Sequence, residues 1–301
     1  MKQLTLSKGF SLHGKGLHTG LEMTVTFLPA PAGHGYKICR TDLDGRPVLD
    51  ATAENVIDTT RGTVLGNESF RCSTVEHALS AFYAAGADNV LIEVDGPEFP
   101  ILDGSAEPYV TNLRKVGLTE QDMEKKCLEV KVPLEVRDEE TGSAVSILPA
   151  KDFRLTVTID FNSELLPMQT ASLSNMKDFA REIGSARTFV FVRDIEPLLE
   201  LGLIKGGDLE NAIVIYETET SQENMDKLCR LTGTGHYDAT ELGYMQYKPL
   251  VWENEPARHK LLDLIGDLSL VGMPIKGHVV ATKPGHTINN LFARKLRTLL
   301  T

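Results

Sequence analysis

The stretch N-E-P-A-R-H-K-L-L-D-L-I-G, Asn254–Gly266, combines an apolar helical stripe with polar groups that need a partner. Leu261 and Ile265 are four residues apart and belong to a stripe that would face a core. His259 and Asp263 have the same spacing, so they share another face, one turn from each other. A buried aspartate beside leucines is costly without a partner, and a metal cation is one such partner. The stretch predicts a helix that carries half of a metal site.

The same spacing also fits two plainer interpretations. An H-x-x-x-D pair on a helix is often a solvated polar face, or an ion pair between its two members. Asp267 follows Asp263 by four residues and places a second carboxylate in the same line. Aspartate is a poor residue for a helix interior, so two of them call for an explanation that a metal would provide. Other features of the chain have to decide between these interpretations.

Composition and charge are those of an ordinary globular protein. The chain has 301 residues, 42% of them hydrophobic, which allows one large domain or two of moderate size. A net charge of −11 argues against nucleic-acid binding, which relies on basic surface. We find no apolar run near the roughly 18 residues of a membrane span and no signal-peptide pattern. The four cysteines are widely spaced and predict neither a thiolate zinc site nor a disulfide. We expect a cytoplasmic protein and a monomer.

Strand-like and helix-like segments alternate and suggest two halves. Val90–Val94 and Arg154–Phe161 are rich in β-branched residues and predict one strand in each half. The polar, charged segment Thr119–Lys126 is the best internal boundary. It predicts an N-terminal domain over 1–122 and a C-terminal domain over 123–301, both of normal size.

The polar stretch Thr218–Tyr247 contains G-T-G and has no clear periodicity. Such a stretch is typical of an irregular surface insertion. His236 lies within it, and we expect a surface residue there rather than a metal ligand.

A second polar pair opens another predicted helix, in the first half. The letters S-T-V-E-H, Ser73–His77, precede a helical apolar pattern that ends near Gly86. Glu76 has two interpretations: with Ser73 it matches a capping box, which local sequence favours, or it is a general base. His77 points away from the apolar stripe, towards small residues that would let another part of the protein approach closely.

The letters K-P-G-H, Lys283–His286, form a third polar region. Gly285 permits a tight turn and delivers His286 from a loop, although a lone histidine there is more often structural. With Glu76 it could form an acid–base pair for attack on a carbonyl. The pattern is not H-E-x-x-H, which disfavours a zincin peptidase. Two histidines and one carboxylate would make a three-ligand set of the kind that leaves the fourth position of zinc open for water.

Six segments carry these residues in a fixed order along most of the chain. They are G-K-G-L-H-T-G (Gly14–Gly20), S-T-V-E-H (Ser73–His77), D-G-P-E-F-P-I-L-D-G-S-A (Asp95–Ala106), S-A-R-T-F (Ser185–Phe189), R-H-K-L-L-D-L-I-G-D-L (Arg258–Leu268) and G-H-V-V-A-T-K-P-G-H-T-I-N-N (Gly277–Asn290). Together they closely resemble the bacterial zinc-dependent UDP-3-O-acyl-N-acetylglucosamine deacetylases, which commit precursor to lipid A synthesis. Any one segment is modest evidence, but six in order outweigh the plainer interpretations.

The resemblance implies a set of metal ligands and a general base. His77, His259 and Asp263 would bind the catalytic Zn²⁺, and Fe²⁺ is an alternative because this ligand set accepts several divalent metals. Glu76 would be the base that activates the attacking water. The implied reaction is hydrolysis of the acetamide of UDP-3-O-(3-hydroxyacyl)-N-acetylglucosamine to the free amine and acetate.

The resemblance also implies three further catalytic residues. His286 would be the acid that stabilises or protonates the leaving group. Asp267 would orient His286 and favour its protonated form through the attraction of opposite charges. Thr188 would help to hold the developing oxyanion. The final proton to the sugar amine could come from His286, or from Glu76 acting twice.

Contacts to a UDP-linked acylated amino sugar follow from the same resemblance. Lys260, pointing off the metal face, would meet the nucleotide or the sugar. Phe189 and the apolar stretch Ile195–Ile215 would line a passage for the fatty acyl chain. Leu203 and Gly207 lie in L-G-L-I-K-G-G-D, Leu201–Asp208, which resembles the turn at the mouth of that passage.

The implied fold is α+β, with two similar β-α-α-β sandwich domains and the active site at their interface. The residues agree on one point, because Glu76 and His77 come from the first half and His259, Asp263 and His286 from the second. The implied internal repeat is not visible as sequence repetition. Two other functions remain open: another metal-dependent amidohydrolase or peptidase, and a non-catalytic sugar-nucleotide sensor, which would not need both Glu76 and His286.

Overall fold

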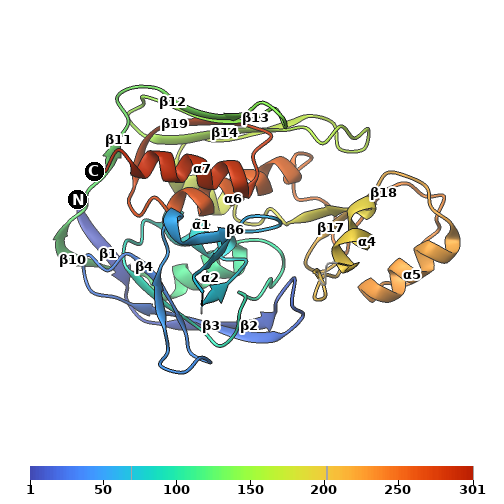
Figure 1. Ribbon diagram of the computed structural model, residues 1–301, viewed down its shortest axis with the longest axis horizontal. Coiled ribbons are helices and arrows are strands. Elements are labelled where there is room, and N and C mark those ends of the chain that lie inside the picture. The colour runs from blue at the N-terminus through green and yellow to red at the C-terminus, as the bar shows by residue number, and fades with distance from the viewer. Residues whose placement is uncertain (69, 201–202, 301) are drawn as a thin grey trace.

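The computed structural model describes residues 1–68, 70–200 and 203–300 and shows an α+β fold. Two β-sheets form the outer layers, and the main helices lie between them (Figure 1). Strand β14 (Phe153–Ile159) illustrates the cause, because its side chains alternate between buried and more exposed. One face of each sheet packs on helices while the other meets solvent. The predicted fold class is confirmed.

The first sheet is built from two hairpins that flank a central strand. Its order is β2 (Phe10–Lys15), β3 (Glu22–Pro29), β9 (Val90–Val94), β4 (Tyr36–Arg40) and β5 (Val48–Asp50). The central strand β9 runs antiparallel to β3 and parallel to β4, and it matches the predicted strand. The helices of this half are α1 (Glu76–Ala85) and α2 (Glu107–Val116).

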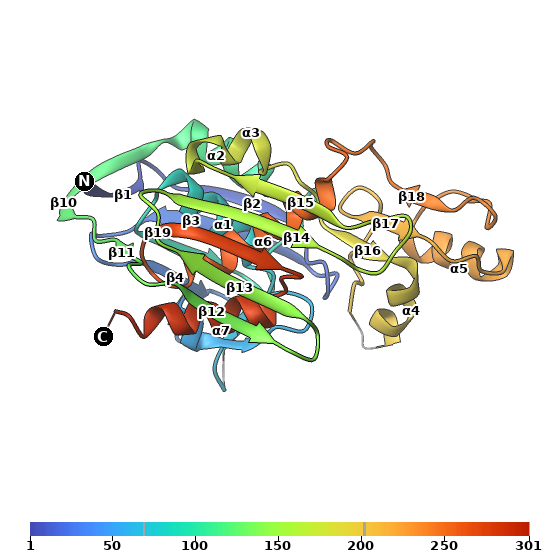
Figure 2. The same cartoon turned by 90° about the horizontal axis from the view of Figure 1, so that it is seen from above.

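The second sheet has the same plan, as Figure 2 shows from above. Its order is β12 (Leu134–Asp138), β13 (Ser143–Leu148), β19 (Ile275–Thr282), β14 and β15 (Gln169–Leu173), and β11 (Leu128–Glu129) also pairs with β19. The central strand β19 runs antiparallel to β13 and parallel to β14. The main helices here are α6 (Glu255–Ser269) and α7 (His286–Arg297).

The two halves therefore repeat one topology. In each, four strands of the sheet (β2–β5 or β12–β15) are followed by an inserted segment, a helix, the central strand and a second helix. The repeat is held by backbone hydrogen bonds, which do not depend on which side chains the strands carry. This explains why the sequence does not display it.

The segment predicted as the internal boundary is a strand. Residues Leu118–Glu124 form β10, which pairs with β1 (Lys2–Leu6) at the start of the chain. The apolar core is also continuous across the halves, since Phe82 of α1 and Leu261 of α6 belong to one buried cluster. The division into domains 1–122 and 123–301 stays a prediction.

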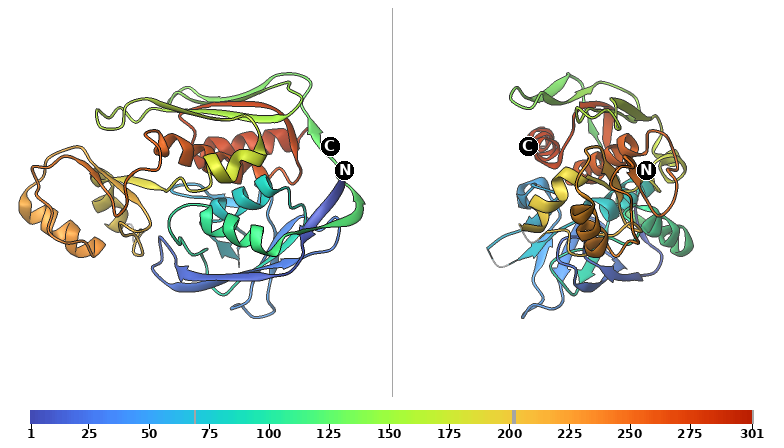
Figure 3. Two further views of the ribbon diagram at one scale, coloured as in Figure 1. Left: turned by 180° about the vertical axis from the view of Figure 1, so that it is seen from behind. Right: turned by 90° about the vertical axis from the view of Figure 1, so that its right-hand side faces the viewer.

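Each half inserts a segment before its first main helix. The first insertion, residues 53–72, contains η1 (Ala53–Asn55), β6 (Val56–Asp58), β7 (Val64–Gly66) and β8 (Arg71–Cys72). The second insertion, residues 176–245, contains η2 (Met176–Asp178), α3 (Phe179–Glu182), β16 (Phe189–Phe191), α4 (Val192–Glu200), β17 (Ile213–Tyr216), α5 (Gln222–Thr232) and β18 (Gly243–Met245). Most of the second insertion projects from one end of the molecule (Figure 3).

The expectation that Thr218–Tyr247 is irregular is wrong, because this stretch holds α5 and β18. Helix α5 starts after Ser221, whose side chain accepts a hydrogen bond from the backbone N–H of Asn224 at 3.2 Å. It ends at Gly233, which has a φ of +67°. His236, whose side chain is 73% exposed, lies at the surface as expected. No described helix is long and apolar enough to cross a membrane.

Candidate active site

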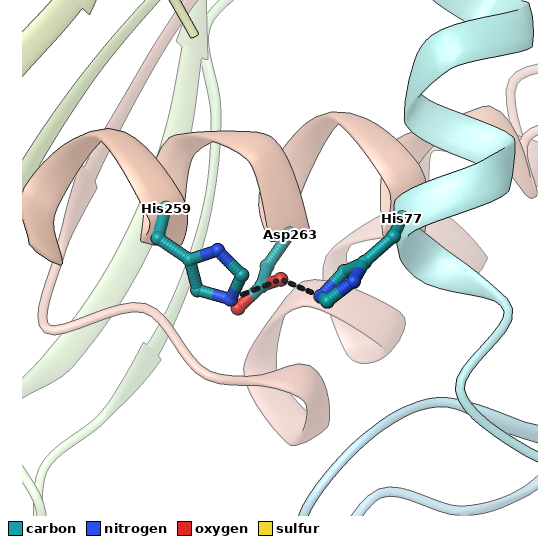
Figure 4. A group of neighbouring side chains, drawn as sticks. All are labelled: His77, His259 and Asp263. Atoms are coloured by element: carbon teal, nitrogen blue, oxygen red, sulfur yellow. Dashed lines mark ion pairs between the residues drawn. The ribbon is translucent and has the colours of Figure 1, made fainter. Parts of the chain in front are cut away.

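Helices α1 and α6 cross at the centre of the molecule and bring the two predicted half-sites together (Figure 4). Gly266 permits the crossing, because a Cβ atom there would lie 2.2 Å from the backbone oxygen of Glu76. A glycine inside a helix costs stability relative to alanine, so close approach is its physical justification. The crossing places His77 of α1 beside His259 and Asp263 of α6, all three buried.

These three side chains form a compact potential metal site. One ligand atom from each lies within 4.8 Å of the others. Asp263 Oδ1 is 3.7 Å from His77 Nε2 and 3.4 Å from His259 Nε2, as the dashed lines in Figure 4 mark. The two imidazole rings are nearly perpendicular, at 87°, and both direct Nε2 to the same carboxylate.

Both histidines are in the form that binds metals. Burial lowers the pKa of His77 to about 3 and also lowers that of His259, so both rings are neutral at physiological pH. The carbonyl of Ala186 lies 3.0 Å from His259 Nδ1, which therefore carries the proton. This leaves Nε2 of His259 with a free lone pair on the side of Asp263.

Asp263 has a buried atom that needs a partner. Its Oδ1 is buried and has no hydrogen-bond donor among the described residues. Burial alone would raise the pKa of Asp263, but His259 and Lys260 outweigh this and hold it well below its usual range. An ionised carboxylate with an unpartnered oxygen beside two neutral imidazoles fits a divalent metal cation.

Lys260 does not point away from the predicted ligands, contrary to expectation. Its Nζ donates to Asp263 Oδ2 at 2.8 Å and lies 5.7 Å from the centre of the Phe189 ring. The cause is the spacing of three residues along α6, which brings the two side chains to neighbouring positions. Lys260 therefore belongs to the rim of the same site.

Glu76 occupies the first position of α1 and faces the site. Its Oε2 accepts a hydrogen bond from the backbone N–H of Thr63 at 3.2 Å. Burial raises the pKa of Glu76 to about 7. Among the described residues no side chain caps the helix start, so the capping-box interpretation with Ser73 is wrong.

His286, Asp267 and their donors form a hydrogen-bonded chain next to Glu76. His286 Nδ1 lies 3.0 Å from Asp267 Oδ2, and the side-chain amide of Asn289 donates to that same oxygen at 2.9 Å. The hydroxyl of Thr63 donates to the other oxygen of Asp267. His286 Nε2 is left facing Glu76 Oε1 at 4.0 Å.

The charge of Asp267 decides the protonation of His286. Burial by itself would lower the pKa of this imidazole. The nearby carboxylate and its hydrogen bond outweigh burial and raise the pKa of His286 to about 9. The pKa of Glu76 is thus near neutral pH and that of His286 is above it, so an ionised carboxylate and a protonated imidazole can stand side by side between pH 7 and pH 9.

An apolar cavity of about 360 Å³ opens beside these groups. Thr188, Phe189, Lys260 and Gly207, all predicted substrate or catalytic contacts, line it. Leu203 is not among the described residues that line it and belongs to a neighbouring depression. Leu201 and Gly202 of the predicted turn lie outside the described residues. The apolar lining from the second insertion includes Val190, Ile195, Leu198, Ile204, Ala212 and Val214.

A comparison with known protein families shows to which family the chain belongs. The family described as UDP-3-O-acyl N-acetylglycosamine deacetylase matches residues 3–228 and 239–298. The chain belongs to this family. Within it, the chain is 59% identical over 297 residues, or 99% of its length, to the Bifunctional enzyme LpxC/FabZ of Bacteroides thetaiotaomicron. It is 43% identical over 98% of its length to the UDP-3-O-acyl-N-acetylglucosamine deacetylase of Myxococcus xanthus, of which it covers 86%.

The chain spans different shares of the lengths of these relatives. The chain spans 64% of the length of the Bacteroides protein and 64% of the Bifunctional enzyme LpxC/FabZ of Porphyromonas gingivalis, to which it is 53% identical over 98% of its own length. The family match leaves out residues 229–238, inside the second insertion. Helices α1 and α6, which carry the potential metal site, lie wholly within the matched part.

Sequence reasoning missed the groups of the first insertion that position the site of this family member. Thr63 contacts both Glu76 and Asp267, and Gly62 leaves room for the carboxylate of Glu76, since a Cβ there would lie 2.9 Å from Oε1. The only signal was a Gly-Thr pair between two short apolar runs. A backbone N–H, which almost any residue offers, leaves no motif.

The loop Gly14–Gly20 was quoted only as a family motif, but it forms a wall of the cavity. Leu17 and His18 line the cavity, and the loop is held by the fully buried carboxylate of Glu98. That carboxylate accepts hydrogen bonds from the backbone N–H groups of His18 and Thr19, both at 2.9 Å. These hydrogen bonds to a buried side chain fix the course of the chain at His18 and Thr19.

Proposed function

We propose that this chain hydrolyses the acetamide of UDP-3-O-(3-hydroxyacyl)-N-acetylglucosamine to the free amine and acetate, the committed step of lipid A synthesis. One observation carries the proposal: a buried His–His–Asp set and a base of raised pKa lie next to an apolar cavity. Family membership supports the same reaction, as does the printed name of the Myxococcus relative.

His77, His259 and Asp263 would hold a Zn²⁺ ion, and the same three ligands would also accept Fe²⁺. When bound, the metal supplies a water of lowered pKa and polarises the acetamide carbonyl. The fit rests on the unpartnered Oδ1 of Asp263 and on the two neutral imidazoles described above. The hydrogen bond from His259 to Ala186 would keep its other ring nitrogen aimed at the site.

Glu76 would act as the general base. Its carboxylate takes a proton from the attacking water as the water oxygen bonds to the acetamide carbon. A pKa of about 7 is suited to this role, because a group near the working pH can both accept and return a proton. The hydrogen bond from the backbone of Thr63 holds Oε2, so Oε1 stays on the side of His286.

His286 would act as the acid, and Asp267 would keep it protonated. The imidazolium faces the site through Nε2 and stabilises the oxyanion, or gives its proton to the amine as the C–N bond breaks. Asp267 fixes the ring through Nδ1 at 3.0 Å. Thr188, which lines the cavity, would help to hold the oxyanion.

The rest of the cavity would hold the substrate. Its apolar wall, from the second insertion, suits a fatty acyl chain. Lys260 at the rim would meet the nucleotide or the sugar, and Phe189, whose ring centre lies 5.7 Å from the Lys260 ammonium, would line the passage for the acyl chain. We place Leu203 and Gly207 at the mouth of this passage. We further propose a cytoplasmic monomer with domains 1–122 and 123–301 and the site between them.

The deciding experiment measures acetate release from UDP-3-O-(3-hydroxyacyl)-N-acetylglucosamine by the purified, zinc-loaded chain. We expect release that stops on chelation and returns with zinc. Glu76→Ala and His286→Ala should each lose at least about a hundredfold in turnover while keeping the metal, because each removes a proton-transfer group.

Different failures of this experiment have different meanings. No release from a folded, metal-loaded chain would refute the proposed reaction and favour a non-catalytic sugar-nucleotide sensor. Release from simple N-acetylglucosamine or a peptide, without need for the acyl chain, would favour another amidohydrolase. Near-normal turnover of Glu76→Ala or His286→Ala would remove that residue from the mechanism.

A further inference from the structure

Strand β17 leads from the apolar cavity into the distal part of the second insertion. Ala212 and Val214 line the cavity, whereas Ile215 belongs to the main core. Side chains alternate along a strand, so Tyr216 is the next residue on the cavity side, about 7 Å beyond Val214. Tyr216 is completely buried, yet it is not among the described residues that line the cavity. Tyr216 therefore lies next to the cavity lining, on the side of β17 that carries Ala212 and Val214.

Contacts of both the hydroxyl and the ring hold the side chain of Tyr216 in place. Its hydroxyl donates to the carbonyl of Ala239 at 2.7 Å and accepts from the backbone N–H of Thr220 at 2.9 Å. Its ring meets the edge of Tyr237, with centroids 6.3 Å apart. It belongs to a second apolar cluster that includes Met225, Leu228 and Cys229 of α5, with Ala239 and Met245.

This cluster and the cavity share a wall. Ile195 of α4 and Val214 of β17 line the cavity and also belong to the second cluster. Side chains from α5 and its flanks therefore fill the space directly beyond the end of the cavity. In Figures 1 and 3, α5 lies beyond α4 and β17, at the outer end of the insertion.

Some of the residues that contact Tyr216 fall outside the family match. Residues 229–238 fall outside the family match, and they include the end of α5 and the loop with Tyr237. The cavity-lining residues of α4 and β17 lie inside the match.

We propose that Tyr216, clamped by α5 and by Tyr237–Ala239, closes the far end of the cavity and limits the length of the acyl chain. The inference rests on the proposed function, which assigns an acyl chain to this cavity. Protein interiors are close-packed, so a methylene group that reaches a fixed ring has no free volume to enter. One methylene more or less in an apolar pocket changes kcat/KM by about 10–200-fold.

The test uses UDP-3-O-(3-hydroxyacyl)-N-acetylglucosamines whose acyl chains differ by steps of two carbons. For Tyr216→Ala we expect kcat/KM on chains longer than the wild-type optimum to rise at least about tenfold relative to that optimum. Tyr216→Phe keeps the ring and should keep the wild-type profile. Met225→Ala, which removes packing from the same cluster, should shift the profile in the same direction by less.

A control separates this effect from loss of stability. Leu113→Ala truncates a side chain of α2 that is 5% exposed and lies in the main core, and it should leave the acyl profile unchanged. If Tyr216→Ala does not fold, Tyr216→Leu and Met225→Ala carry the test. A folded variant that lacks the tyrosine ring and retains the wild-type length profile overturns the proposal.

A second readout separates this inference from the reaction. Calorimetric binding of free 3-hydroxy fatty acids of the same lengths reports on the cavity without turnover. Wild-type binding that stops at one length, extended in Tyr216→Ala, would support the closure even if no acetate were released. Equal length dependence in both proteins, by binding and by turnover, would refute it.

Discussion

The two insertions occupy the same place in the repeated topology but do different work. The first is short, and it places Gly62 and Thr63 against the carboxylate of Glu76. The second is long, and it builds the apolar cavity between α4 and β17. Each leads directly into a helix that carries site residues, α1 in one half and α6 in the other. In the proposed function, one insertion of the repeated scaffold would position catalytic groups and the other would contact the substrate.

The largest expected effect concerns the predicted metal ligands, because each half contributes one of the two histidines. His77→Ala, from the first half, and His259→Ala, from the second, should each lose the bound metal and almost all acetate release. The loss should exceed the roughly 10–100-fold of mutations outside the ligand set. Metal content by elemental analysis and turnover check this, with His13→Ala, whose side chain is 63% exposed, as control. A variant of either histidine that kept its metal would contradict the prediction that the metal needs a ligand from each half.

The next effect separates the two insertions. Thr63→Val removes the hydroxyl that donates to Asp267 but keeps the backbone N–H that binds Glu76. We expect kcat to fall by about 10–100-fold, as for other groups behind a metal site, with KM and acyl preference unchanged. Val214→Ala, in the cavity wall, should instead act mainly on KM. Steady-state kinetics on both variants test whether the first insertion acts on kcat and the second on KM. A raised KM in Thr63→Val would contradict this assignment.

The smallest effect is a shift in pH dependence. As the proposed acid, His286 would work protonated, so we expect activity below its pKa of about 9 and a loss of activity as pH rises through it. Asp267→Asn removes the charge that opposes burial, so the basic limb of the kcat/KM profile should move down by about 1–3 pH units. The acidic limb needs ionised Glu76, and it should stay nearly in place. An unmoved basic limb would show that Asp267 does not set this pKa.

Local patterns could be predicted from the sequence because they depend on near neighbours. The helix around His259 and the strands at 90–94 and 154–159 follow from residue spacing alone. The metal set could not be assembled that way, because His77 and His259 lie in different halves. Resemblance to a family joined them, and the crossing at Gly266 explains physically why they meet.

The errors have physical causes as well. Helix α5 has only a short apolar stripe, Met225, Leu228 and Cys229, at spacings of three and four in a polar segment. The contact of Lys260 with Asp263 depends on a side-chain direction that residue spacing left undecided. Thr63 acts on Glu76 through its backbone, which carries no side-chain signature.

The close crossing at Gly266 also limits how the chain can diverge. Any larger residue there would push α6 away from the backbone of Glu76 and separate Asp263 from His77. The position touches neither the predicted metal nor the cavity, yet it tolerates no gain of volume. Change of volume is therefore least tolerated where the backbones of α1 and α6 meet, whereas residues 229–238 of the second insertion fall outside the family match.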